Sequence, residues 1–317
     1  MPEISVIVPV FNTEPYLVSC LESIQRQDFR DFEVILINDG STDQSLTVLQ
    51  NFARQDSRFT VFSQENAGLS AARNFGLKVS TGNWITFVDS DDVISPTFLK
   101  SLHLTAEHFC VPIAVSGKQT FQDLPPKSFA KNAKPFKISS EDALVRAFYQ
   151  KEIPDFSAWN KLYHKSLWED IAFPCGIFFE DMATIPRLFA KTEAVGVYPA
   201  PLYGYRTRSG SILRSDYDLK KTELLDIAEK NYAYFKSFSP AVRKAAESLL
   251  FSASFSILMR TPEKPEFTAV RERAFKWIRE WRIQALFSPK NRMRNKVAAL
   301  LSLCGKRVLP HLLRRFG

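Results

Sequence analysis

The first part of the chain alternates short apolar runs with segments of helical periodicity. Runs rich in Val, Ile and Phe cover residues 4–10, 32–37, 59–62 and 85–88, as expected of buried strands. Between them, apolar residues recur every three or four positions, as they do on one face of a helix. Strands and helices that alternate in this way form a mostly parallel sheet with right-handed connections. We therefore predict an α/β fold whose mostly parallel sheet is flanked by helices.

Polar residues gather where the predicted strands end. Residues 9–12 complete the first strand, Asp39 ends the second, Asn66 follows the third, and residues 89–92 follow the fourth. The carboxyl ends of parallel strands lie along one edge of the sheet, where ligands of open α/β sheets bind. We expect all four groups to line one crevice.

Three carboxylates, Asp89, Asp91 and Asp92, stand within four residues after the last of these strands. Adjacent anions repel each other, and a helix cap requires only one acid. Hard oxygen ligands at this density suit a divalent cation that itself holds phosphates. The spacing alone leaves two interpretations open, a metal site and a solvated helix cap.

Two further groups allow both a structural and a functional interpretation. Asp39 precedes Ser41 and Thr42, so it could cap the next helix, or its carboxylate could accept hydrogen bonds from a nucleobase or ribose. Residues 68–74 place small side chains at a helix start with Arg73 one turn later. That arrangement suits a site that approaches and neutralises a diphosphate.

The charge of the chain is concentrated at its end. The net charge is +8, but residues 1–280 carry 33 basic and 34 acidic side chains, and nine cations with no acid follow Glu280. The nearly neutral body argues against nucleic acid as a partner. Four scattered cysteines without a Cys-x-x-Cys pair argue against a zinc site or a disulfide framework.

Neither a membrane-spanning segment nor a signal peptide is evident, because no apolar stretch approaches eighteen residues and no basic region precedes an apolar one at the N-terminus. We expect a cytoplasmic protein. Between residues 291 and 316, the apolar residues approximate a helical stripe among cations; they are Val297, Leu300, Leu301, Cys304, Val308 and Leu312. The tail either docks on the body or attaches to the inner, anionic face of the cytoplasmic membrane.

The spacing of elements also predicts the domain organisation. Residues 1–215 form one domain, within which the alternation of strands and helices loosens after Gly117. Apolar periodicity over long segments predicts a helical region with a basic tail over 216–317. No repeat or low-complexity block divides the chain further.

Four motifs taken together resemble a known family. Residues 5–12, 38–43, 66–74 and 89–92 are similar, in order and spacing, to the family 2 glycosyltransferases of the GT-A fold, over roughly residues 1–215. The resemblance implies that residues 1–215 are a Rossmann-like GT-A catalytic domain, with a nucleotide-sugar half over about 1–117 and an acceptor half over about 118–215. It also implies a C-terminal helical extension and a divalent Mn²⁺ or Mg²⁺ ion. It implies that Asp91 contacts the metal, and that a uridine diphosphate-sugar is contacted by Pro9, Phe11, Asp39, Asn66, Arg73, Asp89 and Ser90.

The resemblance continues into the second half of the predicted domain. Residues 159–163, beginning with Trp159, resemble an acceptor-side segment, although Trp159 is also suited to the core. Glu180 and Asp181 resemble the acidic pair in which the aspartate is the catalytic base, and their structural alternative is a cap on the helix over 182–190. Residues 205–211 resemble the segment that closes over the diphosphate, with contacts from Arg206 and Ser211.

Together these features imply an inverting transferase of bacterial surface-polysaccharide type, which moves a hexosyl or N-acetylhexosaminyl group from a UDP-sugar to a hydroxyl of a glycan or lipid-linked acceptor. Its products would belong to a capsule or a lipopolysaccharide. Two alternatives are a catalytically silent nucleotide-binding or scaffold protein and a sugar-nucleotide pyrophosphorylase. The pyrophosphorylases' Gly-rich loop is missing after the first strand. A processive polymerase is disfavoured, since the Gln-x-x-Arg-Trp motif is absent.

Overall fold

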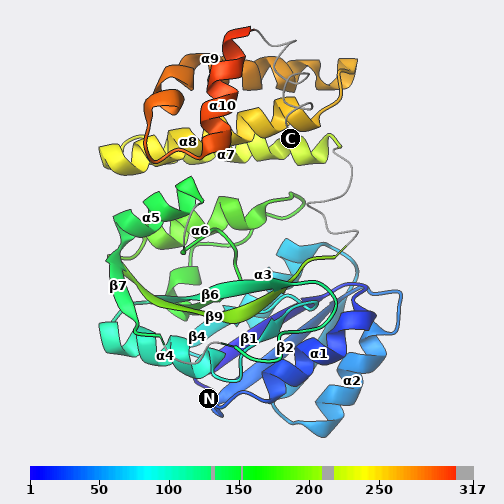
Figure 1. Cartoon of the computed structure of the whole chain (residues 1–317). Helices are drawn as coiled ribbons and strands as arrows, with labels where there is room; N and C mark the ends of the chain where they lie inside the picture. The colour runs from blue at the N-terminus through cyan, green and yellow to red at the C-terminus, as the bar shows by residue number, and fades with distance from the viewer. Residues whose placement is uncertain (130–132, 151–152, 209–217, 305–317) are drawn as a thin grey trace. The chain divides into compact units, whose positions relative to one another are not determined.

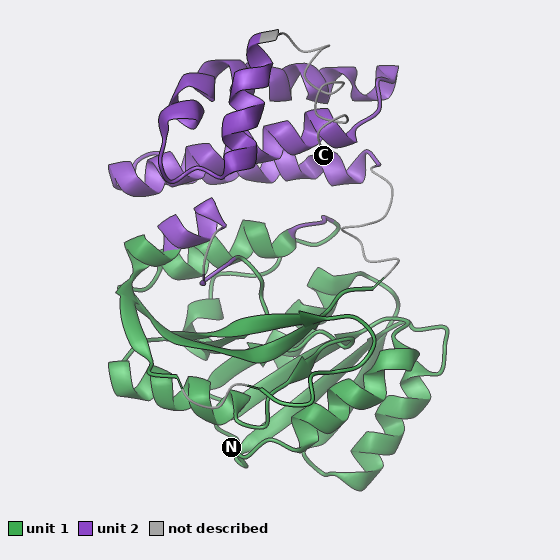
Figure 2. Ribbon diagram, in the orientation of Figure 1, with its two compact units in different colours: residues 1–143, 156–176, 180–214 green, residues 144–155, 177–179, 215–317 purple. Residues whose placement is uncertain are grey.

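The computed structural model describes residues 1–129, 133–150, 153–208 and 218–304 (Figure 1). The contacts within the chain divide it into two compact units (Figure 2). Unit 1 comprises Met1–Ala143, Phe156–Gly176 and Glu180–Arg214, and unit 2 comprises Leu144–Asp155, Ile177–Phe179 and Ser215–Gly317.

Four parallel strands form one side of the sheet of unit 1. They are β1 (Ile4–Val10), β2 (Phe32–Asp39), β3 (Phe59–Gln64) and β4 (Trp84–Phe87), in the order β3-β2-β1-β4. The connecting helices are α1 (Glu14–Gln25), α2 (Ser45–Gln55) and α3 (Leu69–Val79). This is the alternation predicted from the apolar periodicity, and the α/β fold class is confirmed.

The sheet continues with strands of both directions. Beyond β4 the order is β8 (Lys161–His164), β6 (Ile113–Phe121), β9 (Ala194–Arg206) and β5 (Val93–Ile94), while β7 (Phe136–Ser139) also pairs with β9. β8 is antiparallel to β4 and β6, β6 is parallel to β9, and β5 and β7 are antiparallel to β9. The helices of this part are α4 (Phe98–Phe109), the 3₁₀ turn η1 (Lys165–Trp168) and α6 (Glu180–Ala190). Helix α5 (Ser140–Tyr149) begins in unit 1, and its residues 144–149 belong to unit 2.

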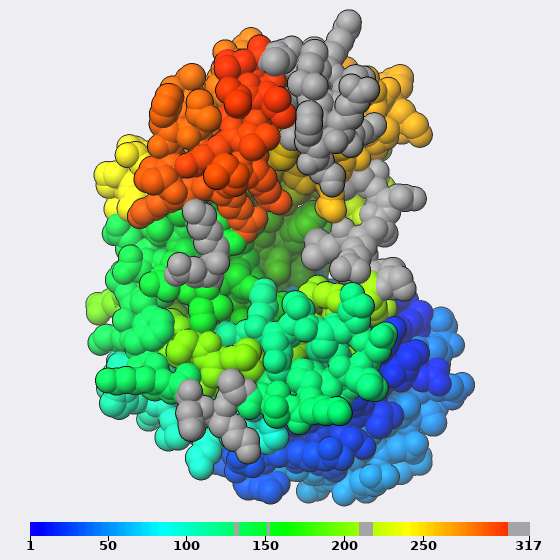
Figure 3. Space-filling view, viewed as in Figure 1, coloured from blue at the N-terminus to red at the C-terminus, as the bar shows by residue number. Residues whose placement is uncertain are grey.

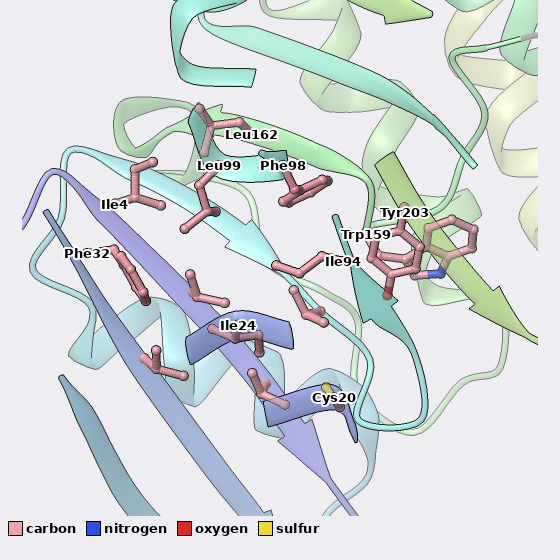
Figure 4. Packing of buried hydrophobic residues seen from close by; sticks show 14 of the residues in the cluster. Ile4, Cys20, Ile24, Phe32, Ile94, Phe98, Leu99, Trp159, Leu162 and Tyr203 are labelled. Carbon is pink, nitrogen blue, oxygen red and sulfur yellow. The ribbon is translucent and has the colours of Figure 1, made fainter. Parts of the chain in front are cut away.

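The parallel strands are buried on both faces of the sheet, which explains why their sequences are continuous apolar runs. Val6, Val8 and Val10 join a buried cluster with side chains of α1 and α4, part of which is drawn in Figure 4. Ile7 points to the other face, where a Cβ atom added to Gly76 of α3 would come within 2.4 Å of it. Because apolar side chains cover both faces of the sheet, its polar groups lie at the ends of the strands.

Unit 2 is helical, as predicted for the end of the chain. It contains α7 (Glu223–Phe235), α8 (Pro240–Arg260), α9 (Thr268–Phe287) and α10 (Met293–Leu301), with the 3₁₀ turns η2 (Lys220–Thr222), η3 (Pro265–Phe267) and η4 (Ser302–Cys304). Leu250, Phe251, Ile257, Ile278 and Trp281 are part of its buried cluster. Among the residues that the structure describes, no helix combines the length and the apolar character needed to cross a membrane.

The face that α10 buries differs from the apolar stripe predicted for the tail. Ala298 and Ala299 are buried, whereas Val297 is 39% exposed and Leu300 is 54% exposed. The surface of α9 and α10 is coloured orange to red in Figure 3. Small side chains let the helix pack closely, so the larger ones face outward. Val308, Leu312 and the basic residues after 304 lie outside the described residues.

Candidate active site

Asp39, at the end of β2, holds the loop that leads into α3. Its carboxylate accepts hydrogen bonds from the N–H groups of Ala67 and Gly68, both at 2.9 Å, and from Nε2 of Gln64 at 2.7 Å. Its backbone oxygen accepts one from Nδ2 of Asn66 at 3.1 Å. Asp39 thus shapes the approach to α3 and does not cap α2.

Gly40 allows two of the strand-end loops to approach each other. Its φ is +71°, and a Cβ atom there would lie 2.7 Å from the backbone nitrogen of Asn66; both conditions favour glycine. On the neighbouring loop, Oδ1 of Asn12 accepts a hydrogen bond from the N–H of Thr42 at 2.8 Å. The ends of β1, β2 and β3 are thereby held together at one edge of the sheet, as the sequence predicts.

Asp92, one of the three acids after β4, is a structural group. Its Oδ2 accepts a hydrogen bond from the hydroxyl of Tyr203 at 2.8 Å, and its Oδ1 accepts one from the N–H of Arg206 at 2.7 Å. The residue is 1% exposed. Burial raises the pKa of Asp92 well above its usual value, and the charges of Asp89 and Asp91 raise it further. Its two acceptor oxygens attach the acidic loop to β9.

Asp89 and Glu180 are joined by one buried cation. Nη2 of Arg73 lies 2.9 Å from Oδ1 of Asp89, and Nη1 lies 2.5 Å from Oε1 of Glu180. Arg73 is 2% exposed, and burial alone would lower its pKa; Asp89 and Glu180 nevertheless raise it above the usual value. Burial also raises the pKa of Asp89 despite the opposing effect of Arg73. Arg73 therefore connects the loop after β4 to the start of α6.

Asp181 belongs to the same electrostatic group. It follows Glu180 in the first turn of α6, and its charge contributes to the raised pKa of Arg73. Its Oδ1 accepts a hydrogen bond from the N–H of Met182 at 2.7 Å, an interaction typical of a helix start. Glu180 instead directs its carboxylate to Arg73, so the pair does more than cap the helix.

Asp91 faces a second arginine. Its Oδ2 lies 2.7 Å from Nε of Arg208, and the side chains of Asp91 and Arg208 are 20% and 32% exposed. Arg206 lies beneath them: it is 6% exposed, and its guanidinium donates to the backbone oxygens of Asp91, Gln122 and Asp123. Of the two guanidinium groups, that of Arg208 is the more accessible.

Two residues of this loop network are absent from the sequence prediction. Tyr203 accepts a hydrogen bond from the N–H of Asp89 at 3.1 Å and donates to Asp92, and so bridges the acidic loop. Arg208 pairs with Asp91. Only weak features of the sequence point to these two residues. Tyr203 and Tyr205 alternate along β9. Arg208 stands two residues beyond Arg206, the spacing that puts side chains on one face of an extended segment.

The remaining predicted donor residues occupy different environments. Pro9 is buried within β1, whereas Asn66 is exposed and Phe11 is 47% exposed. Ser90 is buried, and its Oγ accepts a hydrogen bond from the hydroxyl of Thr13 at 2.9 Å. Ser211 lies outside the described residues.

Trp159 is packed into the core, the structural alternative considered for it. It is 8% exposed and its ring stacks on Tyr203 at 4.5 Å and on Tyr205 at 5.1 Å between centroids; Figure 4 shows it beside Tyr203. The ammonium of Lys118 lies 4.9 Å from the centre of the Trp159 ring. The tryptophan thus supports the strand whose end holds Asp92.

The donor atoms at this edge fit the implied divalent cation. Mg²⁺ and its relatives commonly bind one or two carboxylates together with phosphate oxygens, and Asp91 offers a partly exposed carboxylate beside Asp89. Within the described ranges, no three His, Cys, Asp or Glu residues gather into a group that could hold a metal alone. A cation here would share Asp91 with Arg208 and take further ligands from a bound phosphate.

The sequence of this chain is similar to those of known glycosyltransferases. The model of the family described as glycosyl transferase family 2 matches residues 5–172. Glycosyltransferase GlyA of Streptococcus pneumoniae is 36% identical over 219 residues, which is 67% of this chain and 32% of GlyA. This chain therefore spans about a third of that relative's length.

Solved structures share the fold over nearly the whole chain. TarS 1–349 of S. aureus, in complex with UDP-GlcNAc, superposes with a TM-score of 0.72 at 20% identity, covering 99% of this chain and 92% of that one. The mannosyltransferase PcManGT of Pyrobaculum calidifontis, in complex with GDP-Man and Mn²⁺, gives a TM-score of 0.53 at 16% identity, covering 96% and 88%. These likenesses confirm the predicted GT-A fold, and the family model and GlyA show that the chain belongs to glycosyl transferase family 2.

Proposed function

We propose that the chain transfers a sugar from a UDP-sugar to a hydroxyl of a glycan or lipid-linked acceptor, with inversion at the anomeric carbon. One observation carries this proposal: Arg73 joins Asp89, on the acidic loop, to Glu180, which directly precedes Asp181. A candidate base and a candidate donor-binding loop are thus parts of one buried ionic group. Inversion requires that the acceptor attack from the face opposite the leaving diphosphate. This ionic group includes a candidate base for the acceptor and a loop that is a candidate for binding the donor.

In this mechanism Asp181 accepts the proton of the acceptor hydroxyl as that oxygen attacks the anomeric carbon. Glu180 and Arg73 hold the first turn of α6 against the acidic loop, which positions Asp181 relative to the donor. Arg208 is the accessible cation for the diphosphate, and Arg206 orients the backbone of Asp91. A divalent cation bound at Asp91 would neutralise charge that develops on the leaving diphosphate.

The donor specificity proposed here is a uridine nucleotide carrying a hexose or N-acetylhexosamine. Phe11 offers an exposed ring for a nucleobase, and Asn66 and the loop ordered by Asp39 offer polar groups at the same edge of the sheet. The UDP-GlcNAc complex of TarS supports a uridine donor. The GDP-Man complex of PcManGT makes a guanosine donor the competing choice.

A donor panel tests this function. The chain is incubated with UDP-GlcNAc, UDP-galactose, UDP-glucose and GDP-mannose, each with Mn²⁺ or Mg²⁺, and nucleotide release and thermal shift are measured. UDP release from one uridine donor supports the proposal. In parallel incubations with added pyrophosphate, formation of sugar 1-phosphate and the nucleoside triphosphate would instead identify a pyrophosphorylase. Nucleotide binding without release from any donor would identify a silent binding protein.

We expect Asp91→Asn to weaken activation by metal more than it weakens binding of free UDP. The charge of Asp91 attracts the cation, so the Mn²⁺ concentration for half-maximal UDP release should rise at least about tenfold. Asp56→Asn is the matched control, since Asp56 also pairs with a nearby arginine, Arg58 at 2.7 Å, but stands before β3. An unchanged metal requirement in Asp91→Asn would remove Asp91 from the metal site.

We also propose that the enzyme works on acceptors of bacterial surface polysaccharides at the inner face of the cytoplasmic membrane. Val297 and Leu300 of α10 are exposed beside the exposed Arg294, the combination that favours shallow contact with anionic lipid.

Val297→Glu with Leu300→Glu should reduce flotation with phosphatidylglycerol vesicles several-fold. Val18→Glu, at an exposed valine of α1, is the control, and equal flotation of both variants would contradict attachment through α10.

A further inference from the structure

Unit 2 contains a pocket that the proposed transfer reaction does not use. Its volume is about 560 Å³, within the range of small-molecule sites. It lies between the first half of α8, the C-terminal end of α9 and residues 288–291, with Tyr149 on its wall. Phe251, Trp281, Ala241 and Ala285 contribute much of the lining. The interior therefore suits a hydrocarbon or another apolar body.

Hydrogen bonds hold the wall formed by residues 288–291 in place. Nδ2 of Asn291 donates to the backbone oxygen of Ala285 at 3.0 Å, and Oδ1 of Asn291 accepts from the hydroxyl of Ser248. Asn291 is 6% exposed. In the part of the lining that α9 contributes, Trp281 is 7% exposed and stacks on Trp277 with 4.8 Å between ring centroids. The pocket is formed by packed and hydrogen-bonded groups, so a ligand would find it already shaped.

The charged residues of the lining favour an anion. Lys244 and Lys290 are exposed and line the pocket. Among the described residues, the acid that lines it is Glu247, whose Oε1 lies 3.9 Å from Nε of Arg243. Burial raises the pKa of Glu247, while Arg243 and Lys244 oppose that shift. The first turn of α8 also contributes to the wall and contains no acid, so its dipole adds to the positive potential.

We propose that this pocket binds a single-chain anionic amphiphile, with the hydrocarbon between Phe251 and Trp281 and a phosphate head at Lys244 and Lys290. The apolar lining and the cationic residues are both needed for this assignment. A neutral saccharide would leave the two lysines without a partner, and a free phosphate would leave the aromatic wall unused. If the proposed transfer function is correct, an acceptor carried on a lipid phosphate is a molecule of this class.

Binding of short alkyl phosphates tests the proposal without requiring transfer activity. Butyl, hexyl and octyl phosphate, below their micelle concentrations, are titrated into the full chain by calorimetry. Each added methylene buried in the pocket should tighten binding about three- to fourfold. Inorganic phosphate should bind at least about a hundredfold more weakly than octyl phosphate, because it gains nothing from the apolar lining. Octyl glucoside should bind at least about tenfold more weakly, since its head is uncharged.

Matched variants locate the site. Ala241→Trp fills the pocket and should abolish the dependence on chain length, whereas Ala233→Trp, at an exposed position of α7, should preserve it. Lys244→Gln with Lys290→Gln should weaken octyl phosphate at least about tenfold, and Lys230→Gln, an exposed lysine of α7, should not. Leu300→Glu should leave binding unchanged, which separates the pocket from membrane contact through α10.

Several results would overturn the assignment. These are affinity independent of chain length, equal binding of inorganic phosphate or octyl glucoside, and full binding by the folded Ala241→Trp variant. Circular dichroism of each variant confirms its helix content before titration. If the unmodified chain released UDP but bound no alkyl phosphate, the pocket assignment alone would be refuted. If it bound alkyl phosphates but released no UDP from any donor, only the transfer function would be refuted.

Discussion

Asp181→Asn should lower kcat by about 10²- to 10⁴-fold, or about 3–5 kcal/mol in the barrier, while UDP binds almost as tightly as before. The amide has nearly the shape of the carboxylate but cannot accept the acceptor's proton. Asp181 contacts the N–H of Met182 through Oδ1, and an amide oxygen can still accept that bond. The measurements are kcat at saturating donor and acceptor and the affinity for UDP by calorimetry.

Two controls sharpen this result. Asp170→Asn removes an exposed carboxylate that pairs with Lys191, the residue just beyond the other end of α6, and should leave kcat unchanged. Glu180→Gln keeps the proposed base but weakens the contact with Arg73, so it should lower kcat less than Asp181→Asn does. If Asp181→Asn reduced UDP affinity and turnover equally, Asp181 would belong to the donor site instead.

Arg73→Met should lower the free energy of unfolding by about 3–5 kcal/mol, because it leaves the carboxylates of Asp89 and Glu180 without their shared cation. The guanidinium also lies 5.3 Å from the ring centre of Phe173, within range of a favourable contact. Urea denaturation followed by circular dichroism measures the loss.

Companion variants distinguish an ionic loss from a packing loss. Arg73→Lys keeps the charge but cannot reach both carboxylates in the same geometry, so its loss should be intermediate. Adding Glu180→Gln to Arg73→Met should recover part of the stability, since it removes one unpaired charge. A loss below about 1 kcal/mol in Arg73→Met would show that water reaches and stabilises these carboxylates.

Apolar periodicity predicts the parallel sheet and its helices well, because each element's pattern is local. It also predicts which edge of the sheet collects polar groups, since parallel strands all end on the same side. The roles of individual acids depend on partners far away in sequence. Asp92 is indistinguishable from Asp89 and Asp91 by spacing, and it becomes a structural acceptor through the hydroxyl of Tyr203, 111 residues later, and the N–H of Arg206.

The arginines illustrate the same limit. Arg206 and Arg208 have the same chemistry and stand two residues apart, yet one donates to backbone oxygens and the other pairs with Asp91. Both guanidinium groups lie over the ring of Tyr16, but that of Arg206 also lies 4.5 Å from the ring centre of Phe121 and is the more buried of the two. Likewise, helical periodicity places Val297 and Leu300 on one apolar stripe without showing whether that stripe is buried, and the structure buries Ala298 and Ala299 instead.

The strand that follows the acidic loop, β5, pairs antiparallel with β9, a strand from much later in the chain. The four parallel strands are complete by residue 87, but the acidic loop after them is held by Tyr203 and Arg206. A fragment that stops at residue 117 would keep the four parallel strands but lose Tyr203 and Arg206, whose hydrogen bonds hold the acidic loop. During synthesis on the ribosome, the acidic loop can therefore reach this conformation only after β9 has emerged, long after the four parallel strands are complete.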